Sequence, residues 1–417
     1  MARTATLNDA VALLRPGMNV FVPGTSGESL GFFEALRRSP DKAAGVRFIG
    51  VHFPGINQSD YAGLHPQAQQ RAYFFQPHLR APMREGRVDL MPLDYAGAWR
   101  DLQCLRIDLA LAQVSAPDAS GKMSLGTCYD FTPAVWRKAA LRIAHINPRL
   151  PRTRGAFCID RADCDLICEE DSPLVTQLAG DPSPELAKIG RQVAALIRDG
   201  DTLQLGIGKM QSGVVRSLRN HRHLRVWSGL ITEEITGLLD AGAIEGEAAI
   251  VAGVALGDEA LYRRLAEDTS FYFRSVGETH DVCRIAQIPG FVSVNAAIEV
   301  DLFGQVNCDC LDGRLLAGVG GMPPFVAGAH LSVGGRAIFC LSSTANKGTV
   351  SRIVPKLGPG SMVGAPRHAL DIVVSEHGAL NVAHLSLQQR AEGLIALAAP
   401  EFRDQLAADW SAISANL

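Results

Sequence analysis

Two glycine-rich segments have the composition needed for chemistry on a phosphate or carbonyl oxygen. Gly206-Ile207-Gly208-Lys209-Met210 follows an apolar run and precedes a helical pattern of apolar residues. Glycines allow backbone N–H groups to approach an oxygen closely, beside the positive end of a helix. Gly318-Val319-Gly320-Gly321 is a second loop poor in side chains, and its amides suit the oxyanion hole of an acyl transfer. Each segment is also compatible with a plain turn, because short glycine patterns have low specificity.

Other catalytic and metal-binding signatures are missing from the sequence. It contains no G-x-S-x-G nucleophile elbow, no H-E-x-x-H and no C-x-x-C. The nine cysteines are thinly spread, which predicts ordinary reduced thiols. We therefore expect no metal site and no disulfide framework.

The elements that position these loops occur twice. LLRPGMNVFVPGTSGESLGFFEALRRSP and LIRDGDTLQLGIGKMQSGVVRSLRNH each contain a glycine turn (Gly17 or Gly200), a short apolar strand, a glycine-rich loop and a helix. This repetition predicts two similar α/β halves, although any α/β protein offers several such loops. The polar, proline-bearing segment Ala179–Glu185 is the expected boundary, giving domains over 1–184 and 185–417.

Further along the chain, short apolar runs predict buried strands of parallel or mixed sheets covered by helices. Ser386 and Gln389 form a capping-box pattern, which predicts a helix from that point. The predicted strands are Leu109–Val114, Ile250–Val254, Phe291–Val294, Ala337–Leu341 and Ile372–Val374.

Composition excludes several classes of protein. The 417 residues are 47% apolar and 20% charged, which is typical of a globular protein of two or three domains. A net charge of −3 gives no overall field for nucleic acid or an anionic membrane. The longest apolar stretch is too short to span a bilayer, and the first residues lack the apolar core of a signal peptide. We expect a cytoplasmic protein.

Taken together, ordered segments along nearly the whole chain resemble the acetyl-CoA hydrolase/transferase family, the type-I CoA-transferases. The resemblance implies two similar open α/β domains with the active site between them, and a homo-oligomer as the expected assembly. Its most specific parts are DLALAQVSAPDASGKMSLG (108–126), HINPRLPRTRG (145–155), GIGKM (206–210), SVNAAIEVDLFGQVN (293–307), GVGG (318–321), LSSTANKGTVSRIVP (341–355) and VVSEHG (373–378).

The resemblance also implies a mechanism. In the family a glutamate carboxylate attacks an acyl-CoA and forms first a mixed anhydride and then a glutamyl-CoA thioester, which an incoming carboxylate resolves. By resemblance, 206–210 and 318–320 would line the CoA slot, and Gly321 would offer an oxyanion amide. Lys347 would approach the CoA diphosphate, and Glu376 matches an acidic family position, although a solvated lysine and a structural ion pair are the alternatives. Coenzyme A would be a substrate or product, with no permanently bound cofactor.

One departure from the family pattern concerns the nucleophile. The glutamate normally follows His-Thr or Tyr-Thr a little over twenty residues beyond G-x-G. Here an ungapped alignment places Gly229 at that position, after Trp227 and Ser228. A shift of four residues would instead supply Glu233, at the expense of the agreement with the following helix. Met322-Pro323-Pro324-Phe325 also stands where relatives carry Gln and Asp beside the glycine loop.

Two functions follow from this pattern. The first is an enzyme that processes a small acyl-CoA, by transfer if Glu233 substitutes for the missing carboxylate and by hydrolysis or direct acyl transfer if it does not. The second is a catalytically lapsed subunit that binds acyl-CoA or forms a complex. Acyl-CoA turnover measured beside binding distinguishes them.

Overall fold

A computed structural model describes residues 3–417, which form two compact units. The first contains residues 3–178 and 246–280, and the second contains 179–245 and 281–417. These units differ from the two consecutive ranges expected from the sequence, because 246–280 belong to the first unit. Residues 246–280 are joined to the rest of the first unit by backbone hydrogen bonds, such as Tyr129 N–H to the Gly253 carbonyl (2.8 Å) and Ala156 N–H to the Phe273 carbonyl (2.9 Å).

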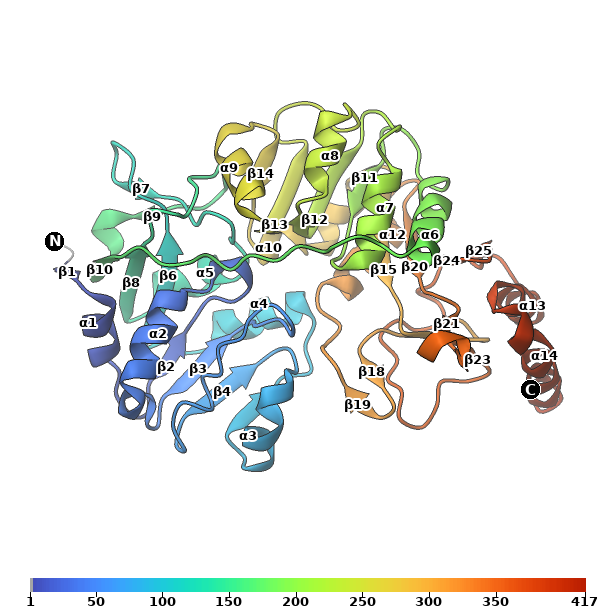
Figure 1. Ribbon diagram of the computed structural model, residues 1–417, viewed down its shortest axis with the longest axis horizontal. Helices are drawn as coiled ribbons and strands as arrows, with labels where there is room; N and C mark the ends of the chain where they lie inside the picture. The colour runs from blue at the N-terminus through green and yellow to red at the C-terminus, as the bar shows by residue number, and fades with distance from the viewer. Residues whose placement is uncertain (1–2) are drawn as a thin grey trace. The chain divides into compact units, whose positions relative to one another are not determined.

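An all-parallel sheet forms the centre of the first unit (Figure 1). Its continuous apolar strands, such as the fully buried β6, are those of a sheet covered on both faces. In spatial order it contains β1 (Arg3–Ala5), β10 (Leu166–Glu169), β8 (Leu141–Ile146), β6 (Leu109–Val114), β2 (Asn19–Phe21), β3 (Arg47–Gly50), β4 (Gln69–Ala72) and β5 (Val88–Leu90).

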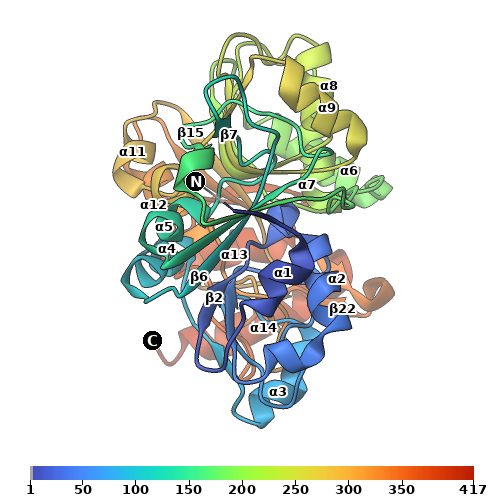
Figure 2. The same cartoon turned by 90° about the vertical axis from the view of Figure 1, so that its left-hand side faces the viewer.

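Helices cover both faces of this sheet. Figure 2 shows α1 and α2 on one face and α4 and α5 on the other. Apolar residues of α1 and α2, including Leu7 and Phe32, pack with strand residues such as Val20 and Leu111 in one core cluster. The helices are α1 (Leu7–Ala12), α2 (Leu30–Arg38), α3 (Arg80–Arg84), α4 (Tyr95–Cys104), α5 (Thr132–Val135), α9 (Glu259–Glu267) and α10 (Val276–Thr279), and β13 (Ile250–Leu256) pairs in parallel with β14 (Phe271–Phe273).

The strands of the second unit are parallel to their neighbours except for the last one, β25. Its strands lie in the order β12 (Arg225–Thr232), β11 (Thr202–Gln204), β15 (Phe291–Ala296), β20 (Arg336–Cys340), β24 (Ile372–Ser375) and β25 (Gly378–Asn381). The helices are α6 (Pro184–Ala194), α7 (Lys209–Ser217), α8 (Ile235–Asp240), α11 (Val282–Ala286), α12 (Met322–Leu331), α13 (Leu387–Leu397) and α14 (Pro400–Ser414).

The predicted repetition is visible in both units. Gly17 and Gly200, each at a φ of +85°, precede β2 and β11. In each unit the strand leads through one helix, α2 or α7, to a neighbouring parallel strand, β3 or β12. The two-domain α/β fold class is confirmed, as is the helix capped by Ser386 and Gln389. None of the helices in residues 3–417 combines the length and apolar character needed to cross a membrane.

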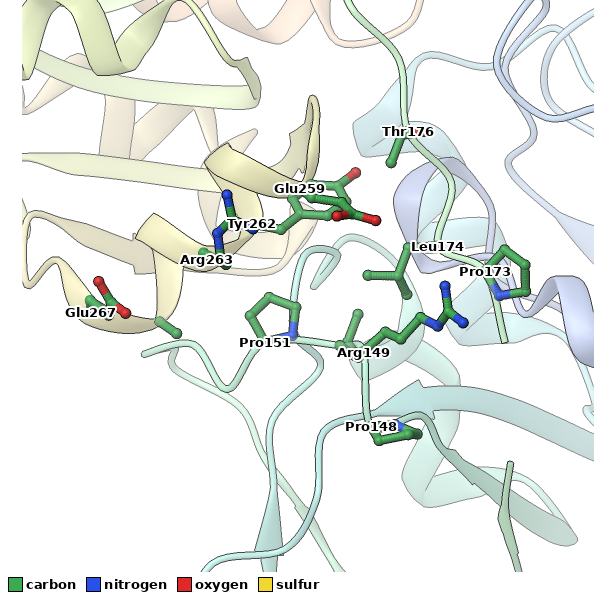
Figure 3. Close-up of a pocket in the computed structure, with 12 residues that line it drawn as sticks. Pro148, Arg149, Pro151, Pro173, Leu174, Thr176, Glu259, Tyr262, Arg263 and Glu267 are labelled. Carbon is green, nitrogen blue, oxygen red and sulfur yellow. The ribbon is translucent and has the colours of Figure 1, made fainter. Parts of the chain in front are cut away.

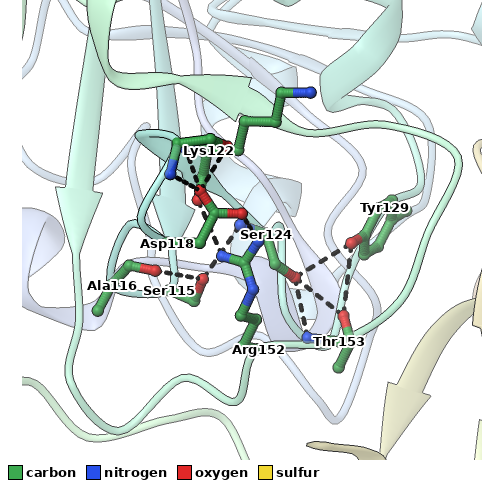
Figure 4. Close-up of polar contacts among 9 residues, drawn as sticks. Ser115, Ala116, Asp118, Lys122, Ser124, Tyr129, Arg152 and Thr153 are labelled. Carbon is green, nitrogen blue, oxygen red and sulfur yellow. Dashed lines mark hydrogen bonds and ion pairs between the residues drawn. The ribbon is translucent and has the colours of Figure 1, made fainter. Parts of the chain in front are cut away.

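Two of the family-like segments form a polar network in the first unit (Figure 4). The buried Ser124 hydroxyl lies 3.1 Å from the Tyr129 hydroxyl and 3.0 Å from the Thr153 hydroxyl, and it accepts the N–H groups of Gly126 and Thr153. Arg152 donates to the Asp118 carboxylate beside it. The segments 108–126 and 145–155 are therefore tied together after β6 and β8, which gives their polar residues a structural role.

Candidate active site

The two glycine-rich loops lie at the same edge of the sheet in the second unit. Loop 206–210 follows β11 and leads into α7, so it lies where the parallel strands end. Helix α12 leads into the start of β20, and the Phe291 N–H at the start of β15 donates to the Ser332 hydroxyl just after α12. Because α12 therefore ends at the amino edge of the sheet, it begins at the carboxyl edge, where loop 318–321 precedes it. Open α/β sheets bind ligands at this edge.

Backbone amides dominate the first loop. Gly208 has a φ of +88°, a conformation that favours glycine, and precedes α7 without a side-chain cap. Ile207 is 38% exposed. Behind the loop the Gln211 amide donates to the Val294 carbonyl (3.1 Å), which fixes the first turn of α7 against β15. The uncapped start of α7 suits an anionic or carbonyl oxygen.

The second loop supplies donors that its helix lacks. Met322 N–H donates to the Val319 carbonyl (3.3 Å), and Gly320 has a φ of +57°. Pro323 and Pro324 carry no N–H, so they remove two of the donors that a helix start ordinarily offers. Because of these two prolines, the backbone N–H groups that could bind an oxygen here come from the glycine loop before α12 rather than from α12 itself.

Strand β12 directs Trp227 and Gly229 to the face of the sheet covered by α12. Trp227 packs against the cluster that contains Phe291 and Phe325, the latter on α12. Ser228 points to the opposite face, and its buried hydroxyl contacts the carbonyl of Leu205 at 2.9 Å. Since strand side chains alternate, Gly229 shares the face of Trp227 and lies two residues closer to the carboxyl edge. A side chain at 229 would therefore project on the same face as the start of α12.

Glu233 is held on the opposite face. Its Oε1 accepts the Ala179 N–H (2.9 Å). The segment that begins at Ala179 packs on α7, where Asp181 pairs with Arg216 (2.6 Å). Helix α7 connects β11 to β12, toward one edge of the sheet, whereas α12 connects β15 to β20, toward the other edge. Because such crossovers are right-handed, the two helices lie on opposite faces of the sheet. The structure thus brings Gly229, and not Glu233, to the face of the 318–321 loop.

The contacts of Glu376 described here are with residues outside the two glycine loops, and Lys347 lies in a different turn. Glu376 follows β24 and accepts the Ser343 N–H (2.9 Å) and hydroxyl, with His377 Nε2 at 3.4 Å. It therefore ties the ends of β20 and β24 together. Lys347 is exposed and has a φ of +59° in the turn between β21 (Thr344–Ala345) and β22 (Val350–Ser351).

One residue at this edge was missed in the sequence reasoning. Asn295 is 8% exposed, and its Nδ2 donates to the Ser293 hydroxyl (2.9 Å), which donates to Gln204 Oε1 (2.6 Å). Ser293 pairs with Gln204 in the ladder, so Asn295 lies beside Gly206 and shares a sheet face with Gly229. One N–H of the amide is engaged in this bond, and its carbonyl oxygen remains available as an acceptor. The alternating polar residues Ser293 and Asn295 in an apolar strand were the available signal.

A cavity of about 660 Å³ lies in the first unit (Figure 3). Residues 148–151, the 173–176 segment and α9 line it, and Tyr262 donates its hydroxyl to the Val175 carbonyl (2.6 Å). Arg149 pairs with Asp171, and Arg263 and Glu259 are exposed at the rim. Both acidic and basic side chains line the cavity, and none of the site residues predicted from the sequence is among its lining residues.

Comparison with known proteins shows the family and the fold of the chain. The model of the acetyl-CoA hydrolase/transferase N-terminal domain matches residues 2–178, and that of the C-terminal domain matches 257–410. The 4-hydroxybutyrate coenzyme A transferase of Clostridium kluyveri is 33% identical over 97% of this chain and 96% of its own. The crystal structure of RipA from Yersinia pestis matches with a TM-score of 0.91 and 29% identity, covering 99% of this chain and 98% of that one. The 4-hydroxybutyrate CoA-transferase of Porphyromonas gingivalis matches with a TM-score of 0.81 and 28% identity, covering 98% and 97%. The chain belongs to the acetyl-CoA hydrolase/transferase family, whose members are acyl-CoA-processing enzymes.

Proposed function

We propose that the protein hydrolyses a small acyl-CoA thioester without a glutamyl-CoA intermediate. Gly229 carries this proposal, because it lies on the α12 face of the sheet where an attacking carboxylate would be needed and has no side chain to acylate. Transfer through Glu233 is disfavoured, since its carboxylate accepts the Ala179 N–H on the α7 side. Coenzyme A is then a product rather than a resident cofactor.

Three features at the carboxyl edge of the sheet have separate roles: one binds CoA, one stabilises the oxyanion and one orients the attacking water. Loop 206–210 and the start of α7 hold the CoA portion through backbone amides. The amides of Gly320 and Gly321 donate to the thioester oxygen as it becomes an oxyanion, an effect worth about 10²–10³ in rate. The Asn295 carbonyl accepts a hydrogen bond from the attacking water, in the space that the absent side chain at 229 leaves open.

The balanced reaction needs only water as the second reactant. The water oxygen bonds to the thioester carbon, and collapse of the tetrahedral intermediate breaks the carbon–sulfur bond. One water proton reaches the CoA sulfur through solvent, and the products are the carboxylic acid and free CoA. Asn295 orients the water and does not take up a proton, because an amide is not a base at neutral pH.

Turnover without a carboxylate acceptor tests the proposal. We expect thiol release from short acyl-CoAs in carboxylate-free buffer, and one ¹⁸O in the acid formed in H₂¹⁸O. Gly229→Glu should lower hydrolysis and introduce CoA exchange between acetate and an acyl-CoA. Gly229→Gln is the matched control, because it has the same size without a nucleophile and should introduce no exchange. Release of CoA by the wild type only when a carboxylate is added would contradict hydrolysis.

A further inference from the structure

Strand β15 carries two polar side chains on a face that is otherwise apolar. Phe291, Ser293 and Asn295 alternate on this face, and Phe291 stacks on Phe325 of α12 with ring centroids 6.2 Å apart. Ser293 is fully buried, and Asn295 is 8% exposed. Burying a hydroxyl and an amide costs free energy unless both are hydrogen-bonded, so their partners determine what the pair can do.

A third buried polar side chain, Gln204, joins this pair from the neighbouring strand. Gln204 lies on β11 and pairs with Ser293 in the parallel ladder, so the two side chains point to the same face of the sheet. The Ser293 hydroxyl donates to Gln204 Oε1 (2.6 Å), and Asn295 Nδ2 donates to the Ser293 hydroxyl oxygen (2.9 Å). The three side chains therefore form one chain of hydrogen bonds from Asn295 to Gln204.

Gln204 sets the direction of this chain. An amide oxygen can only accept, so Gln204 Oε1 takes the single proton of the Ser293 hydroxyl. The hydroxyl oxygen is then an acceptor, and only the NH₂ end of the Asn295 amide can donate to it. The Asn295 carbonyl oxygen therefore points away from Ser293. If the Gln204 amide were reversed, the hydroxyl would donate to Asn295, and the NH₂ group would point away instead.

The free end of Asn295 lies near the carboxyl edge of the sheet. Asn295 is the penultimate residue of β15 and pairs with Phe339 of β20. Phe339 belongs to the same core cluster as Met322, the first residue of α12. Asn295 is thus close to the start of the helix that loop 318–321 precedes. At this place an acceptor suits the attacking water, whereas a donor would suit the oxyanion.

We propose that Gln204 and Ser293 are positioning residues that hold the Asn295 amide with its oxygen toward the attacking water. The inference rests on the proposed hydrolysis and adds the two residues that select the acceptor end of this amide. Both are buried, and they act through Asn295. An amide that turned freely would also present its NH₂ group, which cannot accept a hydrogen bond from water.

Substitutions in the chain test the proposal through kcat and KM. Gln204→Met keeps the length of the side chain without its oxygen, and Ser293→Ala removes the link to Asn295. Each should lower kcat for thiol release about tenfold, which is the discrimination of one hydrogen bond, and leave KM for the acyl-CoA within about twofold. Gln204→Glu at pH 9 should retain kcat within about threefold, because an ionised carboxylate can only accept. A loss in Gln204→Glu as large as in Gln204→Met would overturn the proposal.

Ser332→Ala is the matched control for the loss of a buried hydroxyl. The Ser332 hydroxyl donates to the Ile288 carbonyl (2.6 Å) and accepts the Phe291 N–H (3.2 Å) at the other end of β15. This variant should lose about as much thermal stability as Ser293→Ala and keep its kcat. Equal kcat in the two variants would show that Ser293 has only a structural role.

The orientation of the amide can be measured without turnover. In NMR spectra of the whole protein, the Asn295 NH₂ signals are identified by their loss in Asn295→Asp. We expect the hydrogen-bonded proton to exchange with solvent about tenfold faster in Ser293→Ala than in the wild type and Ser332→Ala. Equal exchange rates in all three would overturn the proposal. If Ser293→Ala does not fold, Gln204→Met gives the same two readouts. Slow exchange in a wild type that releases no thiol without a carboxylate would refute the hydrolysis and leave the positioning of Asn295 intact.

Discussion

His52 should make the first unit lose stability as the pH falls. The ring follows β3, is 3% exposed and packs against Tyr61 with ring centroids 5.5 Å apart. Neither ring nitrogen has a hydrogen-bond partner within residues 3–417. Burial, with a smaller contribution from the positive charge of His78, lowers the pKa of His52 from 6.5 to about 4. The folded state therefore keeps this ring neutral.

The sign and size of the effect follow from linkage. Between pH 6.5 and about 4 the unfolded chain binds a proton at His52 and the folded protein does not, so the free energy of unfolding falls as the pH falls. A separation of about 2.5 pKa units corresponds to roughly 3 kcal/mol in full, and to about 2 kcal/mol at pH 5. At pH 7.5 the contribution is close to zero.

His52→Phe isolates this contribution, because phenylalanine keeps an uncharged ring beside Tyr61. Hydrogen exchange of peptides from β2, β3 and β4, measured for both proteins at each pH, reports the stability of this sheet. We expect the variant to gain about 2 kcal/mol over the wild type between pH 7.5 and pH 5. His384→Phe, at an exposed position, is the control and should show no such gain. Parallel pH dependence of His52→Phe and the wild type would show that the buried ring of His52 does not lower the stability at acid pH.

Three further variants test the site and its supports. Glu233→Gln should leave kcat/KM within about threefold, because Ala179 holds that carboxylate on the α7 side, and a loss of about 100-fold in thiol release would make Glu233 the nucleophile. Millimolar CoA should raise the Tm by mass action, and Lys347→Ala should leave that rise unchanged, because the exposed Lys347 lies in the β21–β22 turn and not in loop 206–210; a smaller rise would place Lys347 in the CoA slot. Ser124→Ala should lower the free energy of unfolding by about 2 kcal/mol in urea titration, since it leaves the N–H groups of Gly126 and Thr153 without their acceptor; a change below about 0.5 kcal/mol would show that water replaces the hydroxyl.

The parts of the fold that local sequence determines were predictable. Leu109–Val114 forms β6 with the predicted bounds, because a continuous apolar run between turns has few other solutions. Ser386 and Gln389 cap α13 through their own neighbouring backbone. The glycine turns at Gly17 and Gly200 follow from the positive φ that glycine tolerates.

Features that depend on distant contacts were not predictable. Residues 246–280 belong to the first unit through hydrogen bonds such as Tyr129 N–H to the Gly253 carbonyl, which no local pattern reveals. Asn295 acquires its position only when β15 pairs with β11. The raised pKa of the Asp130 carboxyl results from its burial in the folded protein, and no pattern in the surrounding sequence indicates that burial.

We propose that this family member works on acyl-CoA without a covalent carboxylate intermediate. Intact-mass analysis of the protein during turnover of an acyl-CoA tests it most directly, with Gly229→Glu as the positive control. We expect free CoA to accumulate while the wild type keeps its unmodified mass, and a CoA-sized adduct to form on the Gly229→Glu variant. A CoA adduct on the wild type during turnover, mapped to Glu233 and lost in Glu233→Gln, would show instead that Glu233 is the nucleophile.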